Sequence, residues 1–336
     1  MFSIPRSVQD PDHPPMPHDA PAGAEADSGS AFERVDESRR DAALARLLGQ
    51  GQQAGMAEVR QFTRAAADLD LALDLMWAAS SADGSYKAVV LIAPQAGGTG
   101  MVFVSRPRSL GEVGVHAALI DFACEQTPPS RVAMAQALLP LNQELERAAL
   151  ERGNFETLAT LAYMRRRVSM ADTGGFIDWP ENVQLLDYEE SRRPLFIAAL
   201  EASYEQTLDC PGLYGRRDTE QVLRGHMATG LFESQMWTLV LVDDAPAGVM
   251  LLNAIPTADC VELVYLGLGV AHRGKGLARR LMQRAFQLCG PREESFLSLA
   301  VDEGNHPARR LYDRLNFRRT TRKLALVRHL KDASPT

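Results

Sequence analysis

The spacing of apolar residues divides the chain into two series of elements. Apolar residues recur at intervals of three and four in residues 37–49 and 55–69, which predicts two amphipathic helices. Three short apolar runs follow, and they end at Ser80, Pro94 and Ser105. Their length and their aliphatic residues predict strands.

The first series continues with a helix, an ambiguous run and a second helix. Helical spacing returns at residues 113–124 and 143–152. Residues 132–139 lie between them and fit a strand or a helix equally well. Residues 158–164 read as a closing strand, and residues 169–181 are rich in turn formers, which predicts a linker.

The second series has the same order of elements. Strands are predicted from 183, at 237–242, 247–255, 261–269, 296–301 and 323–327, and helices at 194–207, 218–229, 276–288 and 307–316. Strands that alternate with helices after an antiparallel start indicate an α/β protein with a mixed sheet covered on both faces. The shared order therefore predicts the same fold twice, in tandem.

Residues 1–30 differ from both series. They hold six prolines, five acidic residues against the single base Arg6, and no leucine. Such a segment cannot bury a core, so we expect a disordered tail. The predicted organisation is this tail, a domain over 31–168, a linker over 169–181 and a domain over 182–330.

Composition narrows the class of protein. The 336 residues include 36 Lys+Arg and 43 Asp+Glu, a formal net charge of −7 that argues against general affinity for nucleic acid or an anionic membrane. The arginine-rich stretch 309–328 is expected to be solvated. No apolar run reaches bilayer length and the N-terminus lacks the apolar core of a signal peptide, so we expect neither a membrane span nor a secretion signal. The four cysteines show no metal-ligand spacing, so we expect a cytoplasmic protein without a metal.

The segment HRGKGLAR, residues 272–279, carries the first sign of chemistry. It joins an apolar strand to an amphipathic helix, and a glycine-rich turn at a helix N-terminus presents free N–H groups to an anion. Gly274 and Gly276 let a phosphate approach the main chain, and Arg273 and Lys275 add positive charge. The same composition also occurs in plain loops.

Two motifs together resemble a known family. Residues 273–278 match the R/Q-x-x-G-x-G/A signature of the GNAT superfamily of N-acetyltransferases, and residues 305–317 resemble its N-x-x-A-x-x-L-Y-x-x-x-G-F element. Asn316 replaces the usual glycine there, and asparagine tolerates the left-handed backbone of a helix C-cap. The resemblance covers residues 183–328 and implies an acetyl-CoA-dependent enzyme.

The resemblance also implies which residues bind acetyl-CoA. In the family the loop holds the pyrophosphate, and the preceding strand, which separates from its neighbour, holds the pantetheine arm. The residues at these places are Leu266, Leu268, Arg273, Gly274, Lys275, Gly276, Leu277, Ala278, Arg279 and Asn305.

Two residues stand where the family places its catalytic groups. Glu262, eleven residues before Arg273, would be the general base that takes a proton from the ammonium of the acceptor. Tyr312 would be the general acid that protonates the leaving thiolate. The alternatives are an exposed polar residue at a strand start for Glu262 and core packing for Tyr312.

The acceptor site is expected in the loop 208–217 and on the strand of Glu262, with Asp209, Tyr214 and Tyr265 as candidate residues. Turn composition explains the same loop, and Cys210 lacks a histidine partner that would make it a nucleophile.

We therefore expect direct acetyl transfer to a primary amine of a small molecule. The alternatives are a non-catalytic acyl-CoA sensor or interaction module, and an enzyme that acetylates protein or peptide amines. The identity of the amine and the oligomeric state stay open.

The first series resembles a degenerate copy of the second. Subtracting 162 from the numbers of residues 268–317 aligns them without a gap with residues 106–155. Glu112 and Leu150 then replace the loop glycine at 274 and the tyrosine at 312. A glutamate repels phosphate and leucine has no proton to donate, so we expect no cofactor site in this half.

Overall fold

The computed structural model describes residues 31–49, 54–68 and 70–330, so the predicted tail over 1–30 lies outside the described residues. Contacts divide this part of the chain into two compact units. The N-terminal unit contains the described residues up to Thr157 and residues 324–330, and the C-terminal unit is Leu158–Lys323. Of the helices in the described ranges, none combines the length and apolar character that crossing a bilayer requires.

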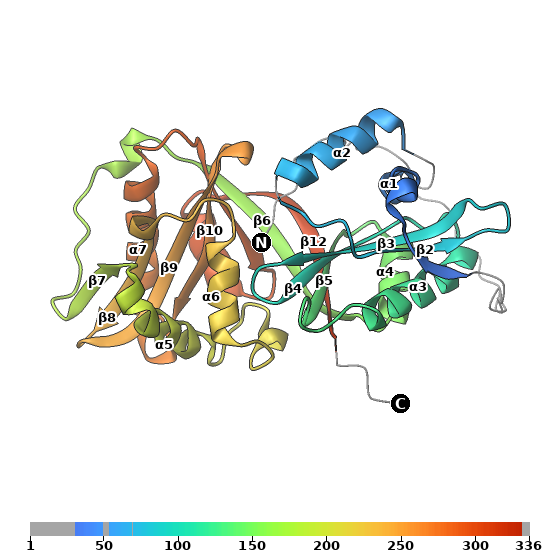
Figure 1. The fold of residues 1–336 in the computed structure, drawn as a ribbon. Helices are drawn as coiled ribbons and strands as arrows, with labels where there is room; N and C mark the ends of the chain where they lie inside the picture. The colour runs from blue at the N-terminus through green and yellow to red at the C-terminus, as the bar shows by residue number, and fades with distance from the viewer. Residues whose placement is uncertain (1–30, 50–53, 69, 331–336) are drawn as a thin grey trace. The chain divides into compact units, whose positions relative to one another are not determined.

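The N-terminal unit is a mixed sheet with helices packed on it (Figure 1). Its strands lie in the order β1-β2-β3-β4-β5, antiparallel except for the parallel pair β4–β5. The ambiguous run 132–139 forms strand β5, so its apolar residues fill a parallel strand. The elements are β1 Phe32–Arg34, α1 Arg40–Leu48, α2 Met56–Asp68, β2 Met76–Ser80, β3 Tyr86–Gln95, β4 Thr99–Val104, α3 Val113–Glu125, β5 Met134–Pro140 and α4 Glu144–Arg152.

The C-terminal unit repeats this arrangement. Its strands lie in the order β7-β8-β9-β10-β11-β6, and β10–β11 is again the parallel pair. The elements are β6 Glu156–Arg167, β7 Val183–Asp187, α5 Arg193–Tyr204, α6 Thr219–Met227, β8 Trp237–Val242, β9 Ala245–Ile255, β10 Cys260–Leu268, α7 Leu277–Cys289, β11 Phe296–Asp302, α8 His306–Arg314 and β12 Arg318–His329.

The ungapped internal alignment agrees with the element boundaries. An offset of 162 residues maps the first residues of β11, α8 and β12 onto the first residues of β5, α4 and β6. Asn154 and Asn316, which this offset pairs, both adopt a left-handed backbone with φ of 64° and 61°. The fold is therefore α/β with the same architecture present twice, as the sequence predicts.

The closing strands depart from a simple tandem arrangement. Residues 158–164 read as the last strand of the first series, yet β6 pairs antiparallel with β11, with Arg167 opposite Phe296 and Leu161 opposite Asp302. Strand β12 extends well beyond the predicted 323–327, and its residues after Lys323 belong to the N-terminal unit. The alternation of apolar and polar residues along a strand shows which of its side chains are buried, but it does not specify the strand with which it pairs.

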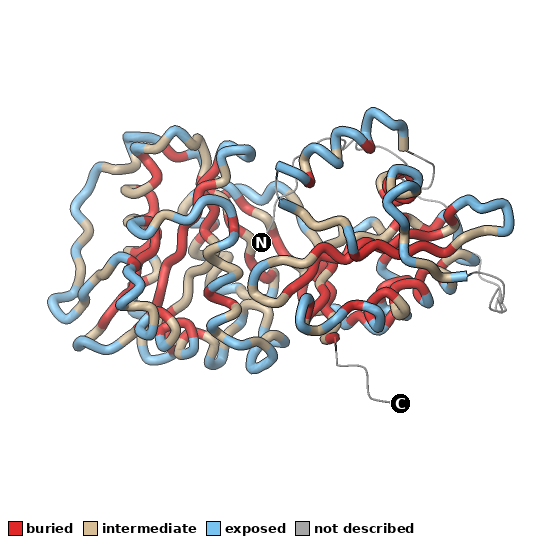
Figure 2. The backbone as a smooth tube through the Cα atoms, viewed as in Figure 1, coloured by how far each residue is buried: buried red, intermediate tan, exposed pale blue. Residues whose placement is uncertain are grey.

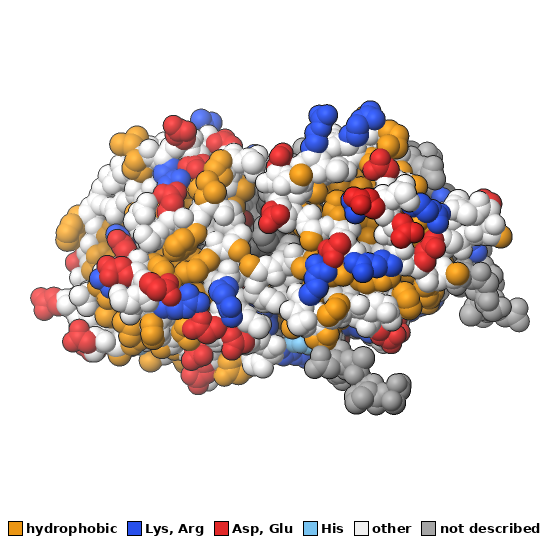
Figure 3. Space-filling view, in the orientation of Figure 1, with side chains coloured by type: hydrophobic (Ala, Val, Ile, Leu, Met, Phe, Trp, Pro, Cys, Tyr) orange, Lys and Arg blue, Asp and Glu red, His pale blue; other side chains and the backbone are white. Residues whose placement is uncertain are grey.

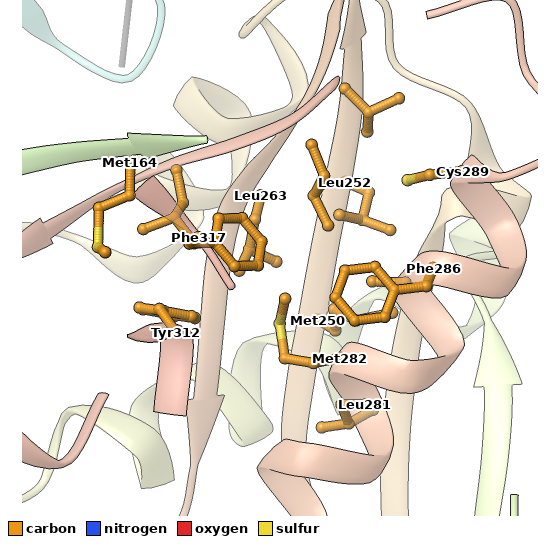
Figure 4. Close-up of a cluster of buried hydrophobic side chains, with 14 of the residues drawn as sticks. Met164, Met250, Leu252, Leu263, Leu281, Met282, Phe286, Cys289, Tyr312 and Phe317 are labelled. Atoms are coloured by element: carbon orange, nitrogen blue, oxygen red, sulfur yellow. The ribbon is translucent and has the colours of Figure 1, made fainter. Parts of the chain in front are cut away.

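Both faces of the C-terminal sheet are buried (Figure 2). One core lies between the sheet and helices α7 and α8, and Figure 4 shows Met282 and Phe286 of α7 close to the strand residues Met250 and Leu252. The second core lies between the opposite face and helices α5 and α6, around the fully buried Trp237. Alternate residues of β10 therefore face different helices.

Candidate active site

Strands β10 and β11 separate partway along their length. Their parallel pairing covers Cys260–Leu263 and Phe296–Leu299, although β10 continues to Leu268. A register shift against β9 between Leu263 and Tyr265 marks a bulge, which bends the strand. Beyond the bulge, Leu266 and Leu268 pair with β9 on one side and have no strand partner on the other within the fully described C-terminal unit. Their main chain can thus receive an extended ligand.

The glycine turn before α7 has the geometry of an anion cradle. Gly274 and Gly276 adopt left-handed backbones with φ of 74° and 82°, which L side chains rarely do. The amide of Arg280 donates to Gly276 O at 3.3 Å and begins the helical bonding, so the amides of residues 277–279 have no intrahelical acceptor. A Cβ at Gly274 would meet nothing within 4 Å, so this side of the turn is open. These residues fit a pyrophosphate.

The side chain of Arg273 points away from this cradle. Its guanidinium donates four hydrogen bonds of 2.7 to 3.0 Å to main-chain oxygens at the end of α5 and of β10. Lys275 and Arg279 are exposed and carry the positive charge of the turn. Arg273 was expected to add positive charge to the phosphate site, but its guanidinium instead holds the turn against the end of α5. The four acceptors are the carbonyl oxygens of Ser203, Glu205, Gln206 and Leu268.

Glu262 is a buried carboxylic acid on β10. It is 6% exposed, and it lies opposite Asn253 of β9 and Ser298 of β11 on the face that α5 and α6 cover. Burial raises the pKa of the Glu262 carboxyl because the charged form loses solvation. Glu262 is therefore not the exposed polar residue that the alternative interpretation expects. A carboxyl group with a raised pKa suits a general base that works near neutral pH.

Tyr312 takes part in packing and also reaches the separated strands. Its ring lies 5.7 Å from that of Phe317 in the core beside α7 (Figure 4). Burial raises the pKa of its phenol, and the nearby Asp209 carboxylate and Tyr265 raise it further. Asp209 lies in the loop between α5 and α6, and the side chain of Tyr265 on β10 faces the same helices, on the side of the sheet opposite to α8. The hydroxyl therefore stays protonated and is placed near groups from both faces.

Asp209 closes the loop between α5 and α6 onto the end of β11. Its Oδ1 accepts the amide of Asp302 at 2.9 Å, and Asp302 Oδ2 accepts the amide of Cys210 at 3.1 Å. Burial raises the pKa of Asp209, and a hydrogen bond from the Asn305 side chain opposes that shift. Asn305 Oδ1 in turn accepts the amide of Ala308 at 3.3 Å and caps α8.

The other predicted acceptor residues have different surroundings. Tyr265 is brought into the site, where its hydroxyl shares a hydrogen bond of 2.8 Å with Ser203 Oγ. Tyr214 is 60% exposed on the surface of the loop. Burial and the carboxylates of Asp209 and Asp302 raise the pKa of the Cys210 thiol, so it does not form the thiolate that a nucleophile needs.

Three polar residues of this unit were not predicted from the sequence. They are Tyr163 on β6, Tyr204 on α5 and His226 on α6, and each buries a polar side-chain atom that has no hydrogen-bond partner. The spacing of Tyr204 and His226 marks them only as helix residues. The sequence pattern places Tyr163 in the closing strand of the first series, because the apolar pattern of β6 does not reveal that this strand pairs with β11.

The N-terminal unit lacks the corresponding groups. The carboxylate of Glu112 accepts a hydrogen bond from the amide of Arg108 at 2.8 Å and lies 3.8 Å from the Arg46 guanidinium. In this loop a side-chain carboxylate of the chain therefore occupies the donors that a bound phosphate would need. Met101 occupies the position of Glu262, because it lies opposite the residue of β5 that corresponds to the partner of Glu262 on β11. Leu150 occupies the position of Tyr312. The two halves share their architecture and differ at these three positions, which is the basis for the expectation of a degenerate copy.

Charges near the chain end are locally paired. Arg319 and Arg322 bind the carboxylate of Glu303, and Arg309 donates to its carbonyl oxygen at 3.0 Å. In the view of Figure 3 basic and acidic side chains lie among one another on each unit. Within the described ranges, no three His, Cys, Asp or Glu side chains are grouped so that they could hold a metal ion.

Comparison with known proteins agrees with this geometry. Residues 200–317 match the family model of the Acetyltransferase (GNAT) family. A GCN5-related N-acetyltransferase from Sphaerobacter thermophilus is 16% identical, with a TM-score of 0.56 over 90% of this chain and 96% of that chain. A GCN5-related glucosamine N-acetyltransferase region of a fungal multi-domain GH3 beta-N-acetylglucosaminidase is 13% identical, with a TM-score of 0.53 over 90% of this chain and 39% of that chain. No curated protein sequence matches the chain.

The fold and the arrangement of the site have the features of acyl-CoA-dependent acyltransferases. The glycine cradle, the separated strands and the matched family model all fall in the C-terminal half. Residues 200–317 thus resemble the Acetyltransferase (GNAT) family, whose activity is acyl transfer, and the solved structures share the fold.

Proposed function

We propose that the C-terminal unit transfers an acetyl group directly from acetyl-CoA to a primary amine of a small molecule. One observation supports this most strongly. Glu262 is buried on β10 one residue before the pairing with β11 ends, and Tyr312 is buried on the opposite face within electrostatic reach of Tyr265, which follows the bulge in β10. An apolar residue at either position would have favoured a non-catalytic acyl-CoA sensor.

The residues that would hold the co-substrate follow from the turn and the bulged strand. The amides of residues 274–279 would bind the pyrophosphate, with Lys275 adding charge, and the main chain of Leu266 and Leu268 would bind the pantetheine arm. Asn305 lies beside this path at the start of α8. Acetyl-CoA supplies a thioester, whose carbonyl carbon accepts the amine.

The proton transfers are assigned to two side chains. A free amine has a pKa near ~10 and is mostly protonated at neutral pH, so Glu262 would take a proton from the ammonium, directly or through water. Tyr312 is a protonated donor and would deliver a proton to the sulfur as the thiolate departs. The amide C–N bond forms as the thioester C–S bond breaks. The attacking nitrogen loses a second proton as the amide forms, and this proton restores the Tyr312 phenol, so the net products are the amide, the CoA thiol and the one proton held by Glu262.

A cytoplasmic location belongs to the same proposal. All four cysteines are free, and three of them, Cys124, Cys260 and Cys289, are buried. Free thiols suit a reducing compartment.

The test measures CoA release with acetyl-CoA and separate panels of small amines and amine-bearing peptides. We expect turnover with a small amine. Acetyl-CoA binding without turnover in either panel would favour the sensor, and turnover with peptides alone would favour a protein or peptide acetyltransferase.

A matched pair of glycine variants tests where the co-substrate binds. Gly274→Ala should raise the KM for acetyl-CoA about tenfold or more, because the methyl group narrows the cradle. Gly84→Ala is the control, since Gly84 lies in a turn of the N-terminal unit with φ of 80° and equally open space. Equal KM values in the two variants would contradict the placement.

A further inference from the structure

The sheet face that carries Glu262 holds three buried polar atoms without hydrogen-bond partners: Tyr163 Oη, Tyr204 Oη and His226 Nε2. In folded proteins the large majority of buried polar atoms are paired. Buried unpaired atoms also occur in the N-terminal unit, but these three lie on one sheet face beside the buried Glu262, and this grouping favours a ligand that supplies the missing partners.

The strand register places Tyr163 beside Glu262. Glu262 lies opposite Ser298 of β11, and Tyr163 lies opposite Ala300, two residues further along the same strand. Paired residues, and residues two apart, point to the same face of a sheet. The Glu262 carboxylate is close enough to raise the pKa of the Tyr163 phenol, in addition to the larger effect of burial. Only β11 separates the two strands.

Tyr204 and His226 approach the same face from the helices. Both contact Tyr265, which follows the bulge three residues after Glu262: the ring of Tyr204 lies 5.8 Å away and that of His226 is stacked at 5.6 Å. The three unpaired atoms thus flank Glu262 on two sides, from β6 and from the helices. Gly212 of the connecting loop lies close to Leu158 at the start of β6, which joins these two sides.

The lining is aromatic, and the guanidinium of Arg217 lies near both Tyr204 and His226. Burial lowers the pKa of His226 to about 3 and raises the pKa of the Tyr204 phenol, so both are uncharged at neutral pH. Neutral donors and acceptors beside aromatic rings suit hydroxyl groups on a ring that also has an apolar face. A polyamine instead needs several carboxylates. Here Arg217, and Lys323, whose Nζ lies 5.3 Å from the Tyr163 ring centroid, would repel it.

We infer that the acceptor is a hydroxylated primary amine of the amino-sugar class, whose hydroxyl groups bind Tyr163, Tyr204 and His226 while its amine meets Glu262. This inference rests on the proposed function. It assigns a substrate-binding residue, Tyr163, to a strand that precedes the matched family region.

The substrate test compares glucosamine, cyclohexylamine and spermidine, with each rate expressed per free amine. Glucosamine and cyclohexylamine share a six-membered ring and one amine, and differ in the hydroxyl groups. A site built to bind hydroxyls rejects an analogue without them, because its own buried groups stay unpaired. We expect kcat/KM for glucosamine to exceed that for cyclohexylamine by about 10³-fold, and spermidine to react more slowly than glucosamine.

The residue test uses Tyr163→Phe and Tyr204→Phe. Each removes one hydroxyl that has no partner within the chain, so the fold should be unaffected. We expect kcat/KM for glucosamine to fall roughly 10- to 100-fold, with the rate for cyclohexylamine and the KM for acetyl-CoA unchanged. Tyr86→Phe is the matched control, since Tyr86 is another buried phenol without a partner and lies in the N-terminal unit. It should change neither rate.

Several outcomes would overturn the inference and leave the proposed function standing. These are equal rates for glucosamine and cyclohexylamine, a preference for spermidine, or an equal loss for both cyclic amines in Tyr163→Phe, which marks a structural role. CoA release with none of the amines, despite acetyl-CoA binding, would remove the proposed function itself.

Discussion

Arg273 belongs to the family signature, yet its side chain serves the fold. The guanidinium bonds four carbonyl oxygens, three of them at the C-terminal end of α5, where the helix dipole favours a cation. We therefore predict that Arg273→Met lowers the stability of the C-terminal unit more than it weakens acetyl-CoA binding. Lys275→Met should do the reverse, because Lys275 is exposed beside the cradle.

The size of the effect follows from which bonds are shielded from water. The bonds to Leu268 O and Ser203 O are partly buried, and the bonds to Gln206 O and Glu205 O are exposed, so water replaces the latter pair when arginine is lost. A hydrogen bond from a charged donor contributes about 1.5 to 3 kcal/mol. Counting only the two shielded bonds at the lower value, Arg273→Met should lose about 3 kcal/mol, which is about 6 to 12 °C in Tm for a unit of this size.

Thermal denaturation and steady-state kinetics measure the two effects separately. Arg273→Lys should recover part of the Tm, because a single ammonium can reach fewer of the four carbonyls. Lys275→Met should keep the Tm within about 1 °C, as expected for an exposed site, and raise the KM for acetyl-CoA. The reasoning is refuted if Arg273→Met keeps the wild-type Tm and its KM for acetyl-CoA rises tenfold, because Arg273 would then bind the phosphate.

Three further predictions concern the proposed catalytic residues and the exchanged strand. Glu262→Gln should lower kcat/KM roughly 10²-fold at neutral pH and recover as rising pH deprotonates the amine; the wild-type rate should fall as pH drops through the Glu262 pKa, which burial raises above its ordinary value. Tyr312→Phe should lower kcat and leave the KM for acetyl-CoA nearly unchanged, the mark of a transition-state contact; wild-type turnover would refute this role. Residues 182–323 expressed alone should aggregate, because β11 loses its partner β6, whereas residues 155–323 should stay soluble on size exclusion.

Helices and strands could be predicted from the sequence because buried apolar residues recur at a different spacing in each. The strand predicted at 237–242 is β8, Trp237–Val242, and the helix predicted at 276–288 is α7, Leu277–Cys289. The left-handed Asn316 was also predictable, since few residues other than glycine tolerate that backbone. These features depend on a few neighbouring residues, whose chemistry is visible in the sequence.

What the sequence did not reveal depends on long-range partners. The direction of the Arg273 side chain depends on carbonyls nearly seventy residues away, at the end of α5. Tyr163 lies 99 positions before Glu262, and only the pairing of β6 with β11 brings them to one face. A strand's alternation states that one face is buried and leaves the neighbouring strand unspecified.

The exchanged strands explain how the first half can lose its chemistry and still be required. Glu112, Met101 and Leu150 stand in that half at the positions of the proposed phosphate contact, base and acid. Its last strand β6 nevertheless pairs with β11 of the C-terminal unit, and the end of β12 completes the N-terminal unit. Each half of the chain therefore depends on the other for a strand that it cannot replace. Substitutions that remove only catalytic groups from one half leave this mutual requirement intact, whereas loss of either closing strand disrupts a whole unit.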